Sequence, residues 1–172
     1  MPTHIFVRHP PLRDVAGLCY GRRDLYAHPD DIAAAAAALR GLTALPMLSS
    51  PAQRCLELAR AIAGPRTVAV DPRLQEMDFG DWEGQRWSAL PRADLDRWAD
   101  DVAGFRPPGG ECFLDVLARL RETVDTLQAP HLIVTHAGVI RAAQHALGGL
   151  PLVNAAAWPV PYGTPIALGQ DA

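Results

Sequence analysis

Two kinds of apolar pattern alternate along the chain and predict its secondary structure. Nearly continuous apolar runs are typical of strands buried on both faces, and they lie at 5–7, 46–50, 68–70 and 131–136. Apolar residues three or four positions apart are typical of helices, and they lie at 32–40, 51–63, 88–101, 112–127 and 139–147. This alternation predicts an α/β fold, in which helices cover both faces of a mostly parallel sheet.

Local signals mark several helix ends. Asp30 and Asp31 suit the first turn of a helix that continues through an alanine run and stops at Gly41. Pro51 suits the first turn of the next helix, with Ser50 as its N-cap. Arg54 then lies near a helix N-terminus, where the helix dipole and free N–H groups already favour an anion.

The remaining segments are predicted to be loops or short elements. Residues 11–28 include an Arg22-Arg23-Asp24 cluster, and residues 71–87 include two glycines, two tryptophans and two glutamates. The tail after Pro151 is rich in proline, and we expect one more strand near 155–160. Because no linker or internal repeat interrupts the pattern, we expect residues 1–172 to form a single domain.

Five polar side chains fall where an α/β fold gathers its functional groups. Arg8-His9 and His136 end predicted strands, Arg54 follows another strand, and Glu76 lies in a glycine-containing loop. Ligands bind at the carboxyl ends of such strands. Two arginines and two histidines that meet there predict a site for a small dianion such as phosphate, and a nearby carboxylate can transfer protons. The alternative for Arg8-His9 is a solvated pair at an ordinary strand end.

Composition and charge narrow the function classes. The net charge of −3 over 172 residues gives no reason to expect nucleic acid or an anionic membrane as a partner. All 16 basic residues are arginines, which excludes mechanisms that need a lysine Schiff base or a P-loop lysine. Three widely spaced cysteines, with no leader or membrane-spanning run, predict a cytoplasmic protein. No HxH or HExxH spacing indicates a metal site.

Five short motifs follow one another over residues 4–141. They are Arg8-His9, Ser49-Ser50-Pro51-x-x-Arg54-Cys55, Leu74-Gln75-Glu76-x-x-x-Gly80-x-Trp82-Glu83-Gly84, Pro108-Gly109-Gly110-Glu111 and Val134-Thr135-His136-Ala137-Gly138. Each motif alone is weakly specific. Together, in this order, they resemble the motifs of the histidine phosphatase superfamily, also called phosphoglycerate-mutase-like.

The resemblance implies a three-layer α/β/α fold and a phosphomonoesterase that acts without a cofactor. In such an enzyme His9 attacks phosphorus and becomes a phosphohistidine. Arg8, Arg54 and His136 bind the phosphoryl oxygens, and Glu76 protonates the leaving oxygen. The substrate is expected to be a small phosphate ester.

Further roles follow from the same resemblance. Glu83 competes with Glu76 for the acid role, although a neighbouring arginine or the backbone is the better partner for Glu83. Independently of the resemblance, the adjacent Arg22 and Arg23 in the 11–28 loop suit an anionic substrate, with a solvated pair beside Asp24 as the alternative. We expect Gly21, Arg22 and Ala137 to contact the substrate. We expect a monomer or a homodimer.

The chain departs from the family at Pro10, where most members have glycine, and proline removes an N–H that could point toward the phosphate. Arg-His-Pro-Pro, with Cys-Tyr-Gly-Arg-x-Asp at residues 19–24, looks most like the α-ribazole phosphatase branch, which acts on a cobalamin precursor. Two alternatives stay open. One is phosphoryl transfer of the phosphoglycerate mutase type, which usually needs a longer covering segment, and the other is a phospho-ligand-binding protein without turnover.

Overall fold

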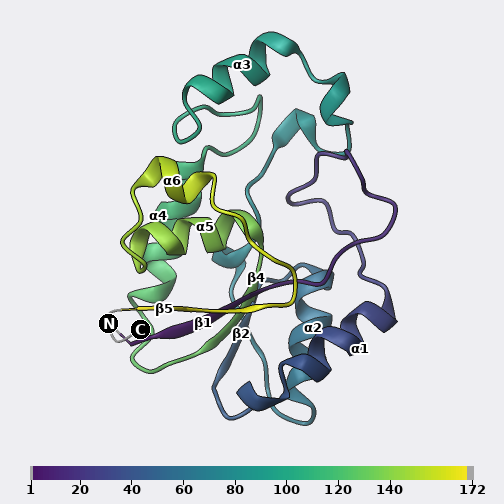
Figure 1. The fold of residues 1–172 in the computed structure, drawn as a ribbon, viewed down its shortest axis with the longest axis vertical. Coiled ribbons are helices and arrows are strands. Elements are labelled where there is room, and N and C mark those ends of the chain that lie inside the picture. Colours follow the sequence, from purple (N-terminus) through teal and green to yellow (C-terminus); the bar gives the residue numbers. More distant parts are fainter. Residues whose placement is uncertain (1, 170–172) are drawn as a thin grey trace.

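Four of the predicted strands join a fifth in one sheet, which the computed structural model describes within residues 2–169 (Figure 1). The strands are β1 (His4–Arg8), β2 (Met47–Ser49), β3 (Ala69–Val70), β4 (Leu132–Thr135) and β5 (Pro165–Leu168). Their order is β3-β2-β4-β1-β5, with β5 antiparallel to β1 and the other pairs parallel. β1 and β4 are therefore interior strands, as their continuous apolar runs predict.

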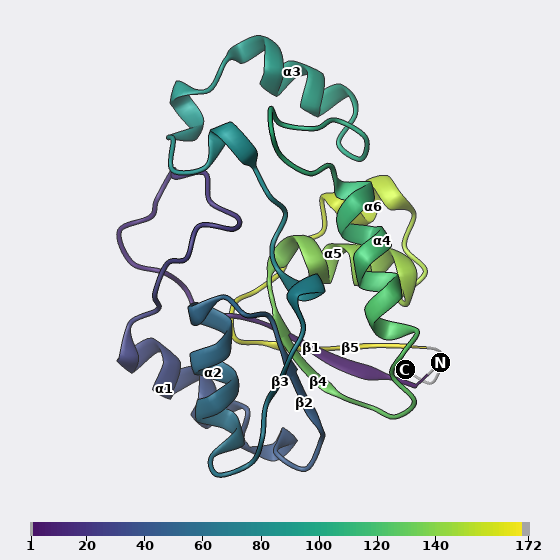
Figure 2. The same cartoon turned by 180° about the vertical axis from the view of Figure 1, so that it is seen from behind.

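Helices cover both faces of the sheet and make the three-layer α/β/α fold that was expected (Figure 1, Figure 2). One face carries α1 (Pro29–Ala38) and α2 (Gln53–Ala63), and the other carries α4 (Phe113–Val124), α5 (Ala137–Ala146) and α6 (Leu152–Ala156). The helix α3 (Arg92–Asp100) lies apart from the sheet, at the far end of the molecule. No helix within residues 2–169 combines the length and apolar character needed to span a bilayer.

Neighbouring residues of β1 point to opposite faces of the sheet. Phe6 packs in the core cluster that includes α4 and α5, whereas Val7 packs in the cluster that includes α1 and α2. Both side chains are fully buried. Burial of a side chain of this size contributes roughly 1.5–3 kcal/mol. The apolar run of β1 therefore holds both helical layers to the sheet.

The pairing of the parallel strands brings three polar residues to one edge of the sheet, because β1 and β2 both pair with β4. At the carboxyl ends of these strands the His9 N–H donates to the Thr135 carbonyl at 3.1 Å, and the Ser50 N–H donates to the Val134 carbonyl at 3.0 Å. His9, Ser50 and His136 therefore lie side by side where the three strands end.

The strand predicted near 155–160 is wrong. Residues 152–156 form α6 instead, with Pro151 as its N-cap, because leucine and alanine after a proline favour a helical turn. The last strand is β5, further along the chain, where Pro165 pairs with Val7. A proline is tolerated there because it is the first residue of an edge strand.

The cap predicted for the second helix is also wrong. α2 begins at Gln53, and Ala52 is its N-cap. The Gln53 N–H donates to Asp24 Oδ1 at 2.9 Å, so a carboxylate from a distant loop satisfies the helix end. Ser50 Oγ accepts the N–H of Ala52 at 3.3 Å, outside the helix, and lies 2.8 Å from His136 Nε2. The stop predicted at Gly41 differs as well, because α1 ends at Ala38 and a 3₁₀ turn follows at Arg40–Leu42.

Residues 78–112, together with Cys19, build a small, largely aromatic core apart from the sheet. The helix predicted over 88–101 is divided into a 3₁₀ turn at Trp87–Ala89 and α3, whose N-cap is Pro91. Trp82 stacks on Phe105 with ring centroids 5.8 Å apart, and Trp87 stacks on Trp98 at 5.6 Å. Trp87 and Trp98 also line a cavity beside Glu76. Trp82 is therefore part of the core, and Trp87 is part of the cavity wall.

Candidate active site

His9 follows β1 and is buried at the sheet edge, with 2% of its surface exposed. Its Nδ1 lies 2.7 Å from the carbonyl oxygen of Pro10. Because a carbonyl only accepts, Nδ1 carries the proton and the lone pair is on Nε2. Burial, helped by the charges of Arg54 and Arg8, lowers the pKa of His9 to about 3, so the ring is neutral near pH 7. A neutral imidazole with an oriented lone pair is suited to nucleophilic attack.

Arg54 lies in the first turn of α2, as predicted, and its side chain is fully buried. Its Nη1 donates to the Arg23 carbonyl at 2.9 Å and its Nη2 to the Gly21 carbonyl at 2.6 Å. A cation at a helix N-terminus opposes the helix dipole. The backbone carbonyls of the 21–23 loop offset part of this cost and hold the guanidinium in place.

Arg8 brings a second guanidinium to the same edge. Its Nη1 donates to the Val160 carbonyl at 2.8 Å, and its guanidinium lies 3.6 Å from the centre of the Tyr162 ring. The Nε atoms of Arg8 and Arg54 are both buried without a hydrogen-bond partner in the part of the chain that the structure describes. A buried N–H without an acceptor is costly. Two such groups beside His9 indicate a site for an anion.

His136 follows β4 and is the N-cap of α5. Its ring is fully buried, and its centroid lies 5.4 Å from that of His9. Nδ1 faces Arg54 Nη2 at 3.3 Å, and Nε2 lies 2.8 Å from Ser50 Oγ. Since a guanidinium only donates, Nδ1 accepts and Nε2 carries the proton. Burial and the charge of Arg54 hold the pKa of His136 well below its ordinary value, so this ring is neutral too.

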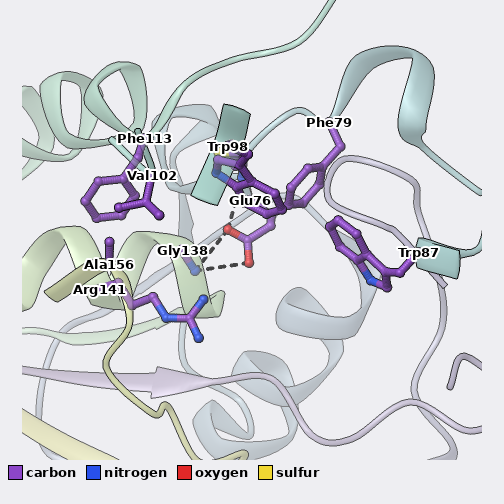
Figure 3. Close-up of a pocket in the computed structure, with 10 residues that line it drawn as sticks. Glu76, Phe79, Trp87, Trp98, Val102, Phe113, Gly138, Arg141 and Ala156 are labelled. Carbon is purple, nitrogen blue, oxygen red and sulfur yellow. Dashed lines mark hydrogen bonds between the residues drawn. The ribbon is translucent and has the colours of Figure 1, made fainter. Parts of the chain in front are cut away.

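Glu76 comes from the 71–87 loop and reaches the start of α5 (Figure 3). The Gly138 N–H donates to both carboxylate oxygens at 3.1 Å, and the Met77 N–H donates to Oε1 at 3.0 Å. A Cβ on Gly138 would lie 2.3 Å from Glu76 Oε1, so glycine is needed for this close approach. The carboxylate thus sits at a helix N-terminus, where the dipole favours negative charge.

Glu83 has a different environment from Glu76. Its two oxygens accept the backbone N–H groups of Gly21, Arg22, Arg23 and Phe79 at 2.9–3.2 Å. Of the two partners expected for Glu83, a neighbouring arginine or the backbone, the structure shows the backbone. Because the carbonyls of Gly21 and Arg23 bind Arg54, Glu83 holds the loop that positions the arginine.

The structure places the three expected substrate contacts in different surroundings. Gly21 lies in the loop held by Glu83, and a Cβ there would lie 1.9 Å from the Met77 carbonyl. Arg22 forms an ion pair with Glu111 at 2.9 Å. Ala137, the first residue of α5, packs in the main core. Contact of these residues with a substrate stays a prediction.

Several groups at this edge were missed from the sequence. Tyr162 comes from the tail, and Arg119 comes from α4, where its position suggests only a surface residue. Arg119 donates to the Gln75 carbonyl at 2.6 Å and the Glu76 carbonyl at 3.2 Å, and pairs with Glu111 at 3.1 Å. It therefore holds the backbone that carries Glu76. Of these missed groups, Ser50 alone had a signal in the sequence for this edge of the sheet, because it ends a predicted strand.

The net charge of the site is positive. Two guanidinium groups stand beside two neutral imidazoles, and the Glu76 carboxylate faces the helix end. Within residues 2–169, no group of three or more His, Cys, Asp or Glu side chains is arranged to hold a metal ion. The arrangement can bind a small dianion and offers it a nucleophile and a carboxylate.

The chain matches the histidine phosphatase superfamily (branch 1) model over residues 5–169. It is 37% identical over 146 residues to a glucosyl-3-phosphoglycerate phosphatase of Mycolicibacterium vanbaalenii, covering 74% of this chain and 62% of that protein. It is 30% identical over 123 residues to the adenosylcobalamin/alpha-ribazole phosphatase of Escherichia coli, covering 66% and 61%. The chain thus spans somewhat less than two thirds of the length of these relatives.

The fold has a close counterpart among solved structures. A phosphoglycerate mutase from Thermus thermophilus superposes with a TM-score of 0.78 and 31% identity, covering 98% of this chain and 93% of that one. The phosphoglycerate-mutase-like fold expected from the motifs is therefore confirmed. Since the family model extends over nearly all of the described residues, this chain belongs to the histidine phosphatase superfamily, branch 1.

Proposed function

We propose that this chain is a phosphomonoester hydrolase that works through a phosphohistidine on His9, without a cofactor. The observation that carries the proposal is the pairing of a free Nε2 lone pair on His9 with two buried arginines whose Nε atoms lack partners within residues 2–169. The arginines supply charge where the transferring phosphoryl group needs it, and the imidazole supplies the attacking electrons.

In the first step, Nε2 of His9 attacks phosphorus opposite the leaving oxygen. The N–P bond forms as the P–O bond breaks, and Arg8 and Arg54 stabilise the charge on the non-bridging oxygens. Glu76 enters this step protonated, because the negative charge of the bound phosphate ester opposes a second negative charge beside it. It gives this proton to the departing alkoxide, which a poor leaving group requires.

In the second step, water cleaves the phosphohistidine. Glu76, now a carboxylate, takes one proton from the water as its oxygen bonds phosphorus and the P–N bond breaks. Inorganic phosphate and neutral His9 result. The backbone bond from Nδ1 to Pro10 keeps the ring orientation for the next turnover.

His136 contributes to the anion site through Arg54. A dianion bound to the arginine competes with Nδ1 of His136 for the Nη2 proton donor. Once Nδ1 is released beside a dianion, protonation of the imidazole becomes favourable, and the ring then donates to a phosphoryl oxygen. Ser50 holds the opposite nitrogen throughout.

For the substrate, we propose a small phosphorylated metabolite. α-Ribazole 5′-phosphate, and with it a place in cobalamin biosynthesis, is supported by the Arg8-His9-Pro10-Pro11 motif and by the Escherichia coli relative. Glucosyl-3-phosphoglycerate is supported by the relative with higher identity. The described cysteines are all free, which fits the proposed cytoplasmic location. Monomer or homodimer stays a prediction.

The test begins with hydrolysis of 4-nitrophenyl phosphate in the presence and absence of a chelator. We expect turnover with release of inorganic phosphate in both conditions. Brief exposure to a labelled phosphate ester should leave an acid-labile, base-stable label on one histidine. His9→Ala should lose both label and turnover, whereas His131→Ala, at the opposite end of β4, should keep both.

The outcomes separate the rival functions. Loss of turnover with chelator would indicate a metal enzyme. Binding without turnover would leave a phospho-ligand-binding protein, and transfer of the phosphoryl group to a second alcohol in place of water would indicate a mutase. A label that persists in His9→Ala would show that another residue is the nucleophile, and His136 would be the first to examine.

A further inference from the structure

A cavity of about 210 Å³ opens beside the proposed catalytic residues. Glu76 and Gly138 belong to its wall, whereas His9, Arg54 and His136 do not. Most of the remaining wall is aromatic or aliphatic and includes Trp87 and Trp98 (Figure 3). Such a wall suits the carbon skeleton of a ligand.

One charged side chain besides Glu76 faces this cavity. Arg141 lies on α5, one turn after Gly138, and Figure 3 shows its guanidinium beside the Glu76 carboxylate. Its Nε donates to the Trp158 carbonyl at 2.9 Å, which fixes the plane of the group. Neither terminal nitrogen of Arg141 donates to any group within residues 2–169, and no carboxylate there lies within 4.0 Å of it.

This environment is unusual for an arginine of the molecule. Arg119 is half-buried like Arg141, but it pairs with Glu111 and three backbone carbonyls. Burial lowers the pKa of Arg141, and the charge of the neighbouring Glu76 opposes this shift. Arg141 nevertheless donates to only one acceptor within residues 2–169. An oriented cation with two free donors in an apolar wall can bind a planar anion with both donors at once.

The geometry of the proposed reaction tells which part of a substrate reaches Arg141. In-line transfer puts the leaving oxygen on the side of phosphorus away from His9, within reach of Glu76. The cavity beyond Glu76 therefore receives the alcohol, not the phosphoryl group. Arg141 then meets whatever the alcohol carries near its ester oxygen.

We propose, building on the phosphatase proposal, that the cavity binds the alcohol part of a phosphomonoester that carries a carboxylate. Arg141 pairs with this carboxylate through its two terminal nitrogens, and Trp87 and Trp98 contact the carbon skeleton. Arg141 is thus a specificity-determining residue for the leaving group. Phosphate esters of neutral alcohols bind the same phosphoryl site but offer no carboxylate to the terminal nitrogens of Arg141.

Two substrates that differ at one position test the proposal. 3-Phosphoglycerate and glycerol 3-phosphate share the phosphate, the ester carbon and the neighbouring hydroxyl, and differ only in a carboxylate against a hydroxymethyl group. We expect a higher kcat/KM for 3-phosphoglycerate in the wild type. Arg141→Gln should lower this preference at least about tenfold, since hydrogen bonds between charged groups are among the stronger ones.

The loss should affect 3-phosphoglycerate alone. Glycerol 3-phosphate and 4-nitrophenyl phosphate should change less than about threefold in Arg141→Gln, and Arg141→Lys should recover part of the preference. Arg121→Gln, an exposed arginine on α4, is the matched control and should behave as the wild type. Equal losses for all three esters would overturn the proposal, because Arg141 would then act on the phosphoryl group or on Glu76. An unchanged preference would overturn it as well.

A binding measurement separates this proposal from the phosphatase proposal. Calorimetry on His9→Ala protein, which cannot form the intermediate, should show tighter binding of 3-phosphoglycerate than of glycerol 3-phosphate. Adding Arg141→Gln should abolish the difference. A wild type that turns over no ester but keeps this binding preference would defeat the phosphatase proposal and support the carboxylate site. If the wild type hydrolyses esters but His9→Ala binds both ligands equally, the phosphatase proposal is supported and the carboxylate site is defeated.

Discussion

Replacing Gly138 by alanine tests how Glu76 is held, because the added methyl group meets the carboxylate directly. A Cβ at this position would lie 2.3 Å from Glu76 Oε1 and 3.3 Å from Cδ. Ordinary contact begins near 3.4 Å, so the carboxylate has to retreat by about 1 Å. The backbone of Gly138 needs no left-handed conformation, and alanine can take its place in the helix.

The expected cost falls on catalysis more than on stability. Alanine is favoured over glycine in a helix by up to about 0.8–1 kcal/mol. Weakening a hydrogen bond to a charged group costs about 1.5–3 kcal/mol. The net loss of roughly 1–2 kcal/mol lowers Tm by only a few degrees in a chain of this size. A displacement of about 1 Å in a catalytic group, in contrast, costs on the order of a hundredfold in rate.

The assay compares two leaving groups. An alkyl alkoxide needs the proton from Glu76, whereas nitrophenolate leaves well without it. At saturating substrate, Gly138→Ala should slow the burst phase with an alkyl phosphate about a hundredfold and with 4-nitrophenyl phosphate far less. Burst rates are required because Glu76 also serves the second step, which both substrates share. Glu76→Gln should show the same contrast.

Gly41→Ala is the matched control. Gly41 is exposed in a 3₁₀ turn, and a Cβ there would meet nothing within 4 Å. It should leave both burst rates unchanged. If Gly138→Ala slowed both substrates equally, Glu76 would not be the acid. If it slowed neither while the fold stayed intact, the contact between Gly138 and Glu76 would have no part in catalysis, and the same pair of measurements on Glu83→Gln would follow.

Three further predictions rest on other contacts. Arg54→Ala should lower kcat/KM by about 10²–10³. It should also lower Tm, because the carbonyls of Gly21 and Arg23 lose their donors. An effect on kcat/KM of less than about fivefold would show that Arg54 does not bind the substrate. Glu83→Gln should speed hydrogen exchange at the amides of residues 21–23, which lose a charged acceptor, and unchanged exchange would show that Glu83 does not hold the loop. His4 is buried with both ring nitrogens unpaired within residues 2–169, and burial, followed by the charge of His131, lowers its pKa. Neutral His4 therefore contributes its full stability above about pH 6.5, the ordinary pKa, and this stability is lost as the pH falls, because the unfolded chain then binds a proton that buried His4 binds poorly. His4→Leu should flatten the fall of Tm between about pH 7.5 and 5. An unchanged slope of Tm against pH would contradict this.

Pro10 illustrates how a departure in sequence can leave the chemistry intact. The proline lacks an N–H, which removes one donor that the anion site could have used. The structure uses the carbonyl of Pro10 instead, as the acceptor for Nδ1 of His9. Proline keeps that carbonyl and restricts the backbone that carries it, so the orientation of the nucleophile does not depend on glycine at this position.

The sequence by itself determined the framework. Burial on both faces of a strand requires continuous apolar residues, so β1 and β4 were recognisable from local pattern alone. The residues that end those strands, His9 and His136, were then predicted to share one sheet edge, since parallel strands bring their carboxyl ends together. The pattern placed Arg54 near a helix N-terminus and Glu76 only in a glycine-containing loop. The resemblance to a family then gave each of them a role at the phosphate.

The tertiary structure decided the hydrogen-bond partners. Glu83 binds the N–H of Gly21 across 62 positions of sequence, and Asp24 caps α2 from 29 positions away. Hydrophobic periodicity reports which side of an element is buried, but not which distant segment faces it. The same reason hid Arg141, which the helical pattern describes only as a polar position on α5. Whether such a residue faces water or the wall of a cavity depends on how the helices and the aromatic segment pack, and only the folded chain settles that.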